Sequence, residues 1–159
     1  MKVVIIGSGN IGTHFAVEFA TKTYDVRVIS SKPNEIQKTL NVVYDDGSVK
    51  SASRVKVSDD VDSDVKTADM ILITYPAFMI PETAKRVCKN IKEGAAVGII
   101  PGTGGGEFSF KQCIKEKAIT VFGLQRVPAV ARLVRYGETV RVSGIRNKLH
   151  IAAIPVNNA

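Results

Sequence analysis

A short hydrophobic segment that runs directly into a glycine-rich turn constrains this chain more than any other feature. Lys2 to Ile6 is rich in β-branched residues, and Gly7-Ser8-Gly9-Asn10-Ile11-Gly12 follows at once. Beyond the turn, Phe15 and Phe19 are spaced as on one face of a helix. The sequence therefore predicts a buried strand, a tight turn and a helix from about Asn10 to Lys22.

Strand and helix patterns alternate along most of the remaining chain, which predicts an α/β fold with parallel strands and right-handed crossovers. Asn41 to Ser58 departs from this alternation, and Asp45-Asp46-Gly47 within it is typical of the turn of an inserted β-hairpin. We expect a Rossmann-type doubly wound, mainly parallel sheet. The other expected strands are Asp25 to Ser30, Ala68 to Tyr75, Ala95 to Ile100, Ile119 to Phe122, Thr139 to Ser143 and Leu149 to Ile154, and the other expected helices are Pro33 to Leu40, Ile80 to Ile91 and Phe108 to Lys117.

Length and composition limit the classes of protein to consider. The 159 residues are 45% hydrophobic and 23% charged, as in one soluble globular domain, and we expect residues 1–159 to form it. No apolar run approaches the roughly 20 residues that span a bilayer, and the apolar opening is too short for a signal peptide. We therefore expect a cytoplasmic protein that does not enter a membrane.

Charge and cysteine content argue against two other classes of partner. The net charge is +7, but the bases are scattered among acids, and no aromatic residues alternate with them as in a nucleic-acid-binding surface. Cys88 and Cys113 form no metal-binding pattern with the two histidines, so we expect free thiols and no metal site. Basic residues are frequent from Lys111 onward, which suits either a solvated face or the attraction of a polyanionic cofactor.

The glycine spacing has a chemical reason in this context. Gly7 permits the tight turn, Gly9 lets bare backbone approach a diphosphate, and Gly12 lets the helix pack closely on the strand. The free N–H groups of the first helical turn then bind the phosphates. The sequence predicts that Gly7, Ser8, Gly9, Asn10, Ile11 and Gly12 bind the diphosphate of a dinucleotide cofactor.

The end of the second expected strand discriminates between nicotinamide cofactors. An Asp or Glu usually stands there in NAD enzymes and binds the adenosine ribose, but this chain has Ser30-Ser31-Lys32. Hydroxyl donors and an ammonium group are suited to a 2′-phosphate. We therefore expect NADP(H) to be favoured over NAD(H), the alternative being that Lys32 is an ordinary surface lysine.

Loops after the later strands are expected to join the site, because ligands bind beyond the carboxyl ends of parallel strands. We predict that Tyr75, Pro76 and Ala77 lie beside the ribose or nicotinamide. The glycines of the segment from Pro101 to Gly106 imply close approach to the nicotinamide or to an anionic substrate, or only a flexible loop.

Few other polar residues are candidates for chemistry. His14 and His150 lack the partners of a hydride-transfer acid–base group, so we predict no catalytic residue in this chain. Gln125 follows an expected strand and is a candidate substrate contact. Arg126 beside it can bind a substrate carboxylate or pair with a nearby acid.

Several segments in the second half resemble a known family. These are Pro101-Gly102-Thr103-Gly104-Gly105-Gly106-Glu107-Phe108, Gly123-Leu124-Gln125-Arg126-Val127-Pro128, Arg132, and Tyr136-Gly137 before Val140, Val142 and Gly144. They resemble the amino-terminal domain of the octopine/opine dehydrogenase family, and the overall layout is similar to that of ketopantoate reductases.

The resemblance implies a reductase that joins an amino acid to a 2-oxo acid: an imine forms, and NAD(P)H delivers a hydride to it. It also implies a helical second domain with the catalytic His, Asp and Arg, which this chain does not contain. In the family, the glycine loop, Ser30 to Lys32 and the Tyr75 loop would contact the cofactor, and Gln125 the oxo acid.

Two functions follow as hypotheses. The first is the NADP(H)-binding domain of an opine-dehydrogenase-like oxidoreductase, inactive until it meets a helical catalytic domain or a partner in a homo-oligomer. The alternative is a nucleotide-sensing regulatory module without catalysis, although such modules often carry the acidic residue that is missing here. Exposed apolar surface near Pro101 and from Val127 to Val134 would suit docking in either case.

Overall fold

A seven-stranded sheet forms the centre of the computed structural model, which describes residues 1–102 and 104–155. All its strands pair in parallel except the edge strand β11, which pairs antiparallel with β8. This confirms the expected Rossmann-type sheet. In sheet order the strands are β11 (Ile151–Ile154), β8 (Thr120–Leu124), β7 (Ala96–Ile99), β6 (Met70–Ile73), β1 (Lys2–Ile6), β2 (Asp25–Ile29) and β5 (Lys56–Ser58).

The strand order reverses between β1 and β6. From β1 the chain builds outward through β2 to β5, then returns to β6 on the other side of β1 and builds outward through β7 to β8. The loops after β1 and β6 therefore lead to helices on opposite faces of the sheet, an arrangement that in doubly wound sheets flanks a crevice at the carboxyl edge. Such a crevice is where doubly wound sheets bind their ligands.

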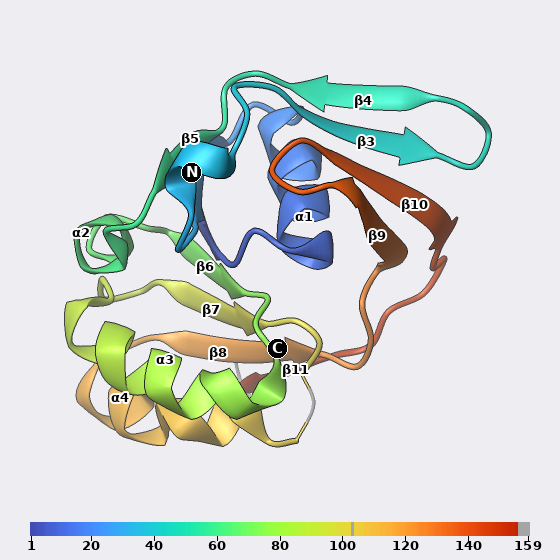
Figure 1. Cartoon of the computed structure of the whole chain (residues 1–159). Helices are drawn as coiled ribbons and strands as arrows, with labels where there is room; N and C mark the ends of the chain where they lie inside the picture. Colours follow the sequence, from blue (N-terminus) through green and yellow to red (C-terminus); the bar gives the residue numbers. More distant parts are fainter. Residues whose placement is uncertain (103, 156–159) are drawn as a thin grey trace.

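Helices cover both faces of this sheet (Figure 1). On one face, α3 buries Ile80, Ala84 and Val87, which recur at helical spacing, and α2 and α4 contribute to the same apolar cluster. On the other face, α1 buries Ala16 and Val17 against β1 and β2. The helices are α1 (Asn10–Ala20), α2 (Val61–Val65), α3 (Ile80–Val87) and α4 (Lys111–Glu116).

A second, four-stranded sheet lies against the outer side of α1 (Figure 1). The expected hairpin is present as β3 and β4, with its turn at Gly47, and it is extended by β10, which runs parallel to β3. α1 is thus enclosed by two sheets. In sheet order the strands are β4 (Val49–Ala52), β3 (Leu40–Tyr44), β10 (Thr139–Ile145) and β9 (Ala129–Arg135).

Some expected elements are wrong. The helix expected from Pro33 to Leu40 is only a 3₁₀ turn, η1 (Pro33–Glu35), because Ile36 is extended and the Gln37 N–H donates to the Gly137 carbonyl at 2.7 Å. The hairpin does not extend to Ser58, since β5 leaves it and joins β2 in the first sheet. Strand β9 and helix α2 were not expected.

Candidate functional site

The loop between β1 and α1 has the geometry that its glycines predict. Gly7 has a φ of +115°, and a Cβ on Gly12 would lie 1.9 Å from the Gly7 carbonyl oxygen, so α1 packs directly against the turn. A Cβ on Gly9, in contrast, would meet nothing within 4 Å. Gly9 is exposed and leaves open space in front of bare backbone. The structural roles predicted for Gly7 and Gly12 are confirmed, and the diphosphate contact stays a prediction.

The first turn of α1 keeps the features of an anion-binding helix end. No side chain caps the helix at Gly9, and the first turn contains no acidic residue. Asn10 does not cap either, because its Oδ1 accepts a hydrogen bond from the Leu133 N–H at 2.7 Å and so joins α1 to β9. Ile11 packs on the apolar cluster beneath. The N–H groups at the start of α1 therefore remain to bind an anion.

The end of β6 lies beside the glycine loop, as the switch in strand order requires. The Thr74 N–H donates to the Ile6 carbonyl at 3.0 Å, and the Tyr75 ring lies 3.2 Å from where a Cβ on Gly7 would stand. Burial raises the pKa of the Tyr75 hydroxyl. Pro76 and Ala77 are exposed and lead into the 3₁₀ turn η2 (Ala77–Met79). Their contact with a cofactor stays a prediction.

The hydroxyl groups of Ser8, Ser30 and Tyr136 meet behind the glycine loop, and Tyr136 was not among the residues predicted for the site. The Ser8 Oγ lies 3.0 Å from the Ser30 Oγ, and the Tyr136 hydroxyl lies 2.8 Å from the first and 3.1 Å from the second. Ser30 is 2% exposed and also accepts the Lys32 N–H at 3.0 Å. Only the Tyr136-Gly137 pair within the family resemblance pointed to this residue.

Ser31 and Lys32 follow at the surface, beyond this buried group. Both are exposed, and the Lys32 Nζ lies 3.0 Å from the Glu35 carboxylate and 5.9 Å from the centre of the Tyr136 ring. Hydrogen bonding to Glu35 raises the pKa of Lys32, which therefore stays a cation. No carboxylate is present at positions 30 to 32.

Gln125 follows β8 at the same carboxyl edge, and β7 and β6 lie between β8 and the strand β1 that leads into the glycine loop. Its N–H donates to the His150 carbonyl at 2.9 Å, and it lines a cavity of about 410 Å³ together with Gly102, Glu107 and Phe108. Arg126 is exposed and makes no ion pair within residues 1–102 and 104–155. Thr103, from the loop before this cavity, lies outside the described residues.

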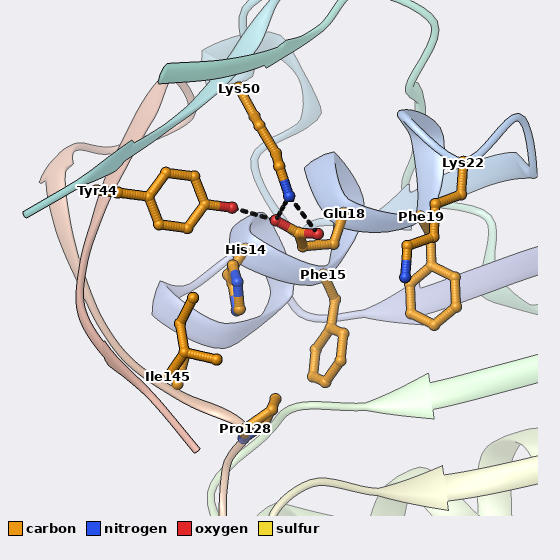
Figure 2. Close-up of a pocket in the computed structure, with 10 residues that line it drawn as sticks. His14, Phe15, Glu18, Phe19, Lys22, Tyr44, Lys50, Pro128 and Ile145 are labelled. Carbon is orange, nitrogen blue, oxygen red and sulfur yellow. Dashed lines mark hydrogen bonds and ion pairs between the residues drawn. The ribbon is translucent and has the colours of Figure 1, made fainter. Parts of the chain in front are cut away.

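A separate cavity of about 290 Å³ lies between α1, the hairpin and Pro128 (Figure 2). Its polar side is Glu18, which accepts hydrogen bonds from the Tyr44 hydroxyl and from Lys50 Nζ at 2.9 and 3.0 Å. His14 is 6% exposed here, and burial lowers its pKa. His14 is thus packed inside the domain, and it lies on the side of α1 covered by the second sheet.

The hydrogen bonds that Glu18 accepts from Tyr44 and Lys50 should make the domain less stable at acidic pH. Burial acts to raise the pKa of Glu18, but hydrogen bonds from Tyr44 and Lys50 outweigh it, and the pKa lies below its ordinary value of 4.5. A lowered pKa contributes stability that is present above pH 4.5 and is lost as the pH falls through the folded-state value. We expect the wild type to lose more unfolding free energy than Glu18→Gln between pH 5 and 3, as measured by urea unfolding. Identical pH profiles would contradict this prediction.

A known protein family matches most of this chain. The family model described as the N-terminus of NAD-dependent glycerol-3-phosphate dehydrogenase matches residues 2–126. The chain belongs to this family. It is therefore an NAD-binding domain, in agreement with its sheet order and its glycine loop.

Curated relatives extend the similarity to nearly the whole chain. An opine dehydrogenase of Arthrobacter sp. (strain 1C) is 27% identical, over 98% of this chain and 45% of its own length. The octopine dehydrogenase of Pecten maximus is 25% identical, over 97% of this chain and 42% of its own. The chain thus spans less than half the length of these relatives.

Solved structures share the fold. An octopine dehydrogenase in complex with NADH and agmatine superposes with a TM-score of 0.85 at 24% identity, over 97% of this chain and 42% of its own. A ketopantoate reductase from Ralstonia eutropha JMP134 gives a TM-score of 0.73 at 20% identity, over 95% and 49% of the two chains. In residues 1–102 and 104–155, no helix is long and apolar enough to cross a membrane, and no group of side chains is arranged to bind a metal.

Proposed function

We propose that this NAD-binding domain is the NADP(H)-binding part of an opine-dehydrogenase-like oxidoreductase, which transfers a hydride to an imine or 2-oxo acid. The observation that carries the proposal is the open space over Gly9, at the point where the strand order reverses and an uncapped helix begins. Bare backbone, free N–H groups and the positive end of the helix dipole are what a diphosphate requires.

The residues present fit such a cofactor. Gly7 to Gly12 would hold the diphosphate, and Tyr75, Pro76 and Ala77 at the end of β6 would border the ribose or nicotinamide. When bound, the nicotinamide would supply the hydride. Gln125 lies on the same edge, in a cavity that an oxo acid can enter. The chain would bind and orient the cofactor, and we propose no catalytic acid or base among its own residues.

The preference for NADP(H) rests on charge at the end of β2. A carboxylate there would repel a 2′-phosphate, and the chain has the hydroxyl of Ser31 and the ammonium of Lys32 at this point instead. Ser31 and Lys32 are exposed and able to reach a ligand. Lys32 must exchange its surface ion pair with Glu35 for the phosphate, and such exposed pairs contribute little.

A second, helical domain or another subunit would supply the catalytic groups. The relatives are about twice as long as this chain. Phe108 and Ile151 are 69% and 55% exposed beside the Gln125 cavity, and Phe78, after β6, is 81% exposed. Large apolar side chains exposed around a ligand-binding edge are typical of a docking surface.

The proposal is tested by titrating the chain with NADPH and NADH, then assaying turnover of pyruvate with a panel of amino acids. We expect tighter binding of NADPH, no turnover by this chain alone, and turnover once the helical domain is supplied. Equal or tighter NADH binding would contradict the cofactor preference, and turnover by the chain alone would contradict the requirement for a second domain or subunit. Cofactor binding without turnover, both for the chain alone and after the helical domain is supplied, would favour a nucleotide sensor.

A further inference from the structure

The hydroxyl groups of Ser8, Ser30 and Tyr136 form a closed ring of hydrogen bonds, with edges of 3.0, 3.1 and 2.8 Å. These residues come from the glycine loop (Gly7 to Gly12, the proposed phosphate loop), the end of β2 and the turn between β9 and β10. Each hydroxyl has one proton, so a ring of three bonds uses all three protons in whichever direction it runs. No proton of this ring remains for a ligand.

Ser30 has no free hydrogen-bonding capacity at all. Besides its two bonds in the ring, its oxygen accepts the Lys32 N–H, so its proton and both lone pairs are used. Ser8 is also buried, at 9% exposure. The ring therefore has a structural role beneath the cofactor site. A 2′-phosphate would be recognised by Ser31 and Lys32.

The turn that carries Tyr136 is fixed against the same region by independent contacts. The Gln37 N–H donates to the Gly137 carbonyl at 2.7 Å, and a Cβ on Gly137 would lie 2.2 Å from the Glu35 carbonyl oxygen. On the preceding strand, the Leu133 N–H donates to Asn10 at the start of α1. The second sheet thus holds both the helix that begins at the phosphate loop and the segment after β2.

From these contacts we infer that Tyr136 is a positioning residue of the cofactor site, through which the second sheet fixes the phosphate loop relative to the end of β2. The inference rests on the proposed function. A dinucleotide places its diphosphate on the loop and its adenosine ribose at the end of β2, so the separation of these two segments determines how well it fits. Because every dinucleotide spans both segments, Tyr136 acts equally on NADPH and NADH.

The test is calorimetric titration of Tyr136→Phe with NADPH and with NADH. Phe keeps the ring packing and removes only the hydroxyl. We expect both affinities to fall by the same factor, about tenfold, the equivalent of one buried hydrogen bond. Lys32→Ala should weaken NADPH alone. Tyr44→Phe is the matched control, since it removes a hydroxyl that bonds Glu18 away from the loop, and it should bind both cofactors as the wild type does.

A double-mutant cycle separates positioning from a general loss of stability. Ser30→Ala breaks the same ring from the β2 side, so the loss of affinity in the Tyr136→Phe, Ser30→Ala double variant should be smaller than the sum of the single losses. Ser30→Ala also serves alone if Tyr136→Phe does not fold, and the same equal loss for both cofactors is expected.

Each contrary result has a distinct meaning. Unchanged affinities in a folded Tyr136→Phe variant with a lowered melting temperature would reduce Tyr136 to a structural residue and overturn the inference. Loss of NADPH affinity alone would mean that Tyr136 contacts the 2′-phosphate, which also overturns it. If the wild type binds neither cofactor, the proposed function fails and takes the inference with it, whereas the first two results leave the proposed function intact.

Discussion

Replacement of Gly9 by alanine is expected to lower the affinity for NADPH about a hundredfold while the melting temperature stays unchanged. A Cβ at this position meets no atom of the protein within 4 Å, and the backbone φ of −81° is one that alanine adopts freely. The added methyl group therefore costs the fold nothing, but it fills space through which a diphosphate must reach the N–H groups of α1. Calorimetry and thermal unfolding on the same sample measure both quantities.

Gly12→Ala adds the same methyl group to the same loop and serves as the comparison for Gly9→Ala. Its Cβ would lie 1.9 Å from the Gly7 carbonyl oxygen, so this variant should lose stability as well as affinity. An unchanged affinity of Gly9→Ala for NADPH would show that the diphosphate binds elsewhere, and the proposed function would then be wrong.

Ser30→Asp is expected to lower the affinity for NADPH about a hundredfold while NADH binding is retained. The Ser8 hydroxyl and the Lys32 N–H already point at the Ser30 oxygen, and the Tyr136 hydroxyl lies within hydrogen-bonding distance of it. A carboxylate in this place would accept hydrogen bonds from all three groups. It would also bring a negative charge close to Ser31 and Lys32, where the 2′-phosphate should bind, while a ribose hydroxyl can donate to it.

Ser30→Asn controls for size, because it introduces nearly the same volume without the charge. We expect Ser30→Asn to lose affinity for both cofactors to a similar extent, and only Ser30→Asp to discriminate between them. Fluorescence titration with both nucleotides measures the ratio. An unchanged ratio in Ser30→Asp would contradict the placement of the 2′-phosphate at the end of β2.

The part of the site that could be predicted from sequence is the part that local chemistry determines. Gly7 and Gly12 have a backbone conformation and a helix contact that only glycine allows, so their spacing alone indicates the turn. The succession of strands and helices likewise predicts the parallel sheet, because each crossover is a local unit. The packing of Thr74 beside Gly7 follows from that sheet order.

The parts that were missed depend on contacts between distant segments. Tyr136 lies 128 residues from Ser8 and 106 residues from Ser30, and no local pattern marks a tyrosine in a turn as their partner. β9 alternates buried Ala129 and Ala131 with exposed residues, and alanine has little intrinsic preference for strands. Pro33 begins a turn that fits a helix locally, but the contact between Gln37 and Gly137 prevents the helix from continuing.

The parallel pairing of β3 with β10 also has a consequence for biosynthesis. Asn41 pairs with Thr139, so the ribosome must add about 100 more residues after β3 before the sheet over α1 can close. At roughly 5 to 20 residues per second, the edge of β3 that pairs with β10 and the part of α1 that β9 and β10 cover stay exposed for about 5 to 20 seconds. An open strand edge is a site of aggregation. A truncated gene product that stops near residue 126, where the match to the family model ends, would keep that edge permanently open and prone to aggregation.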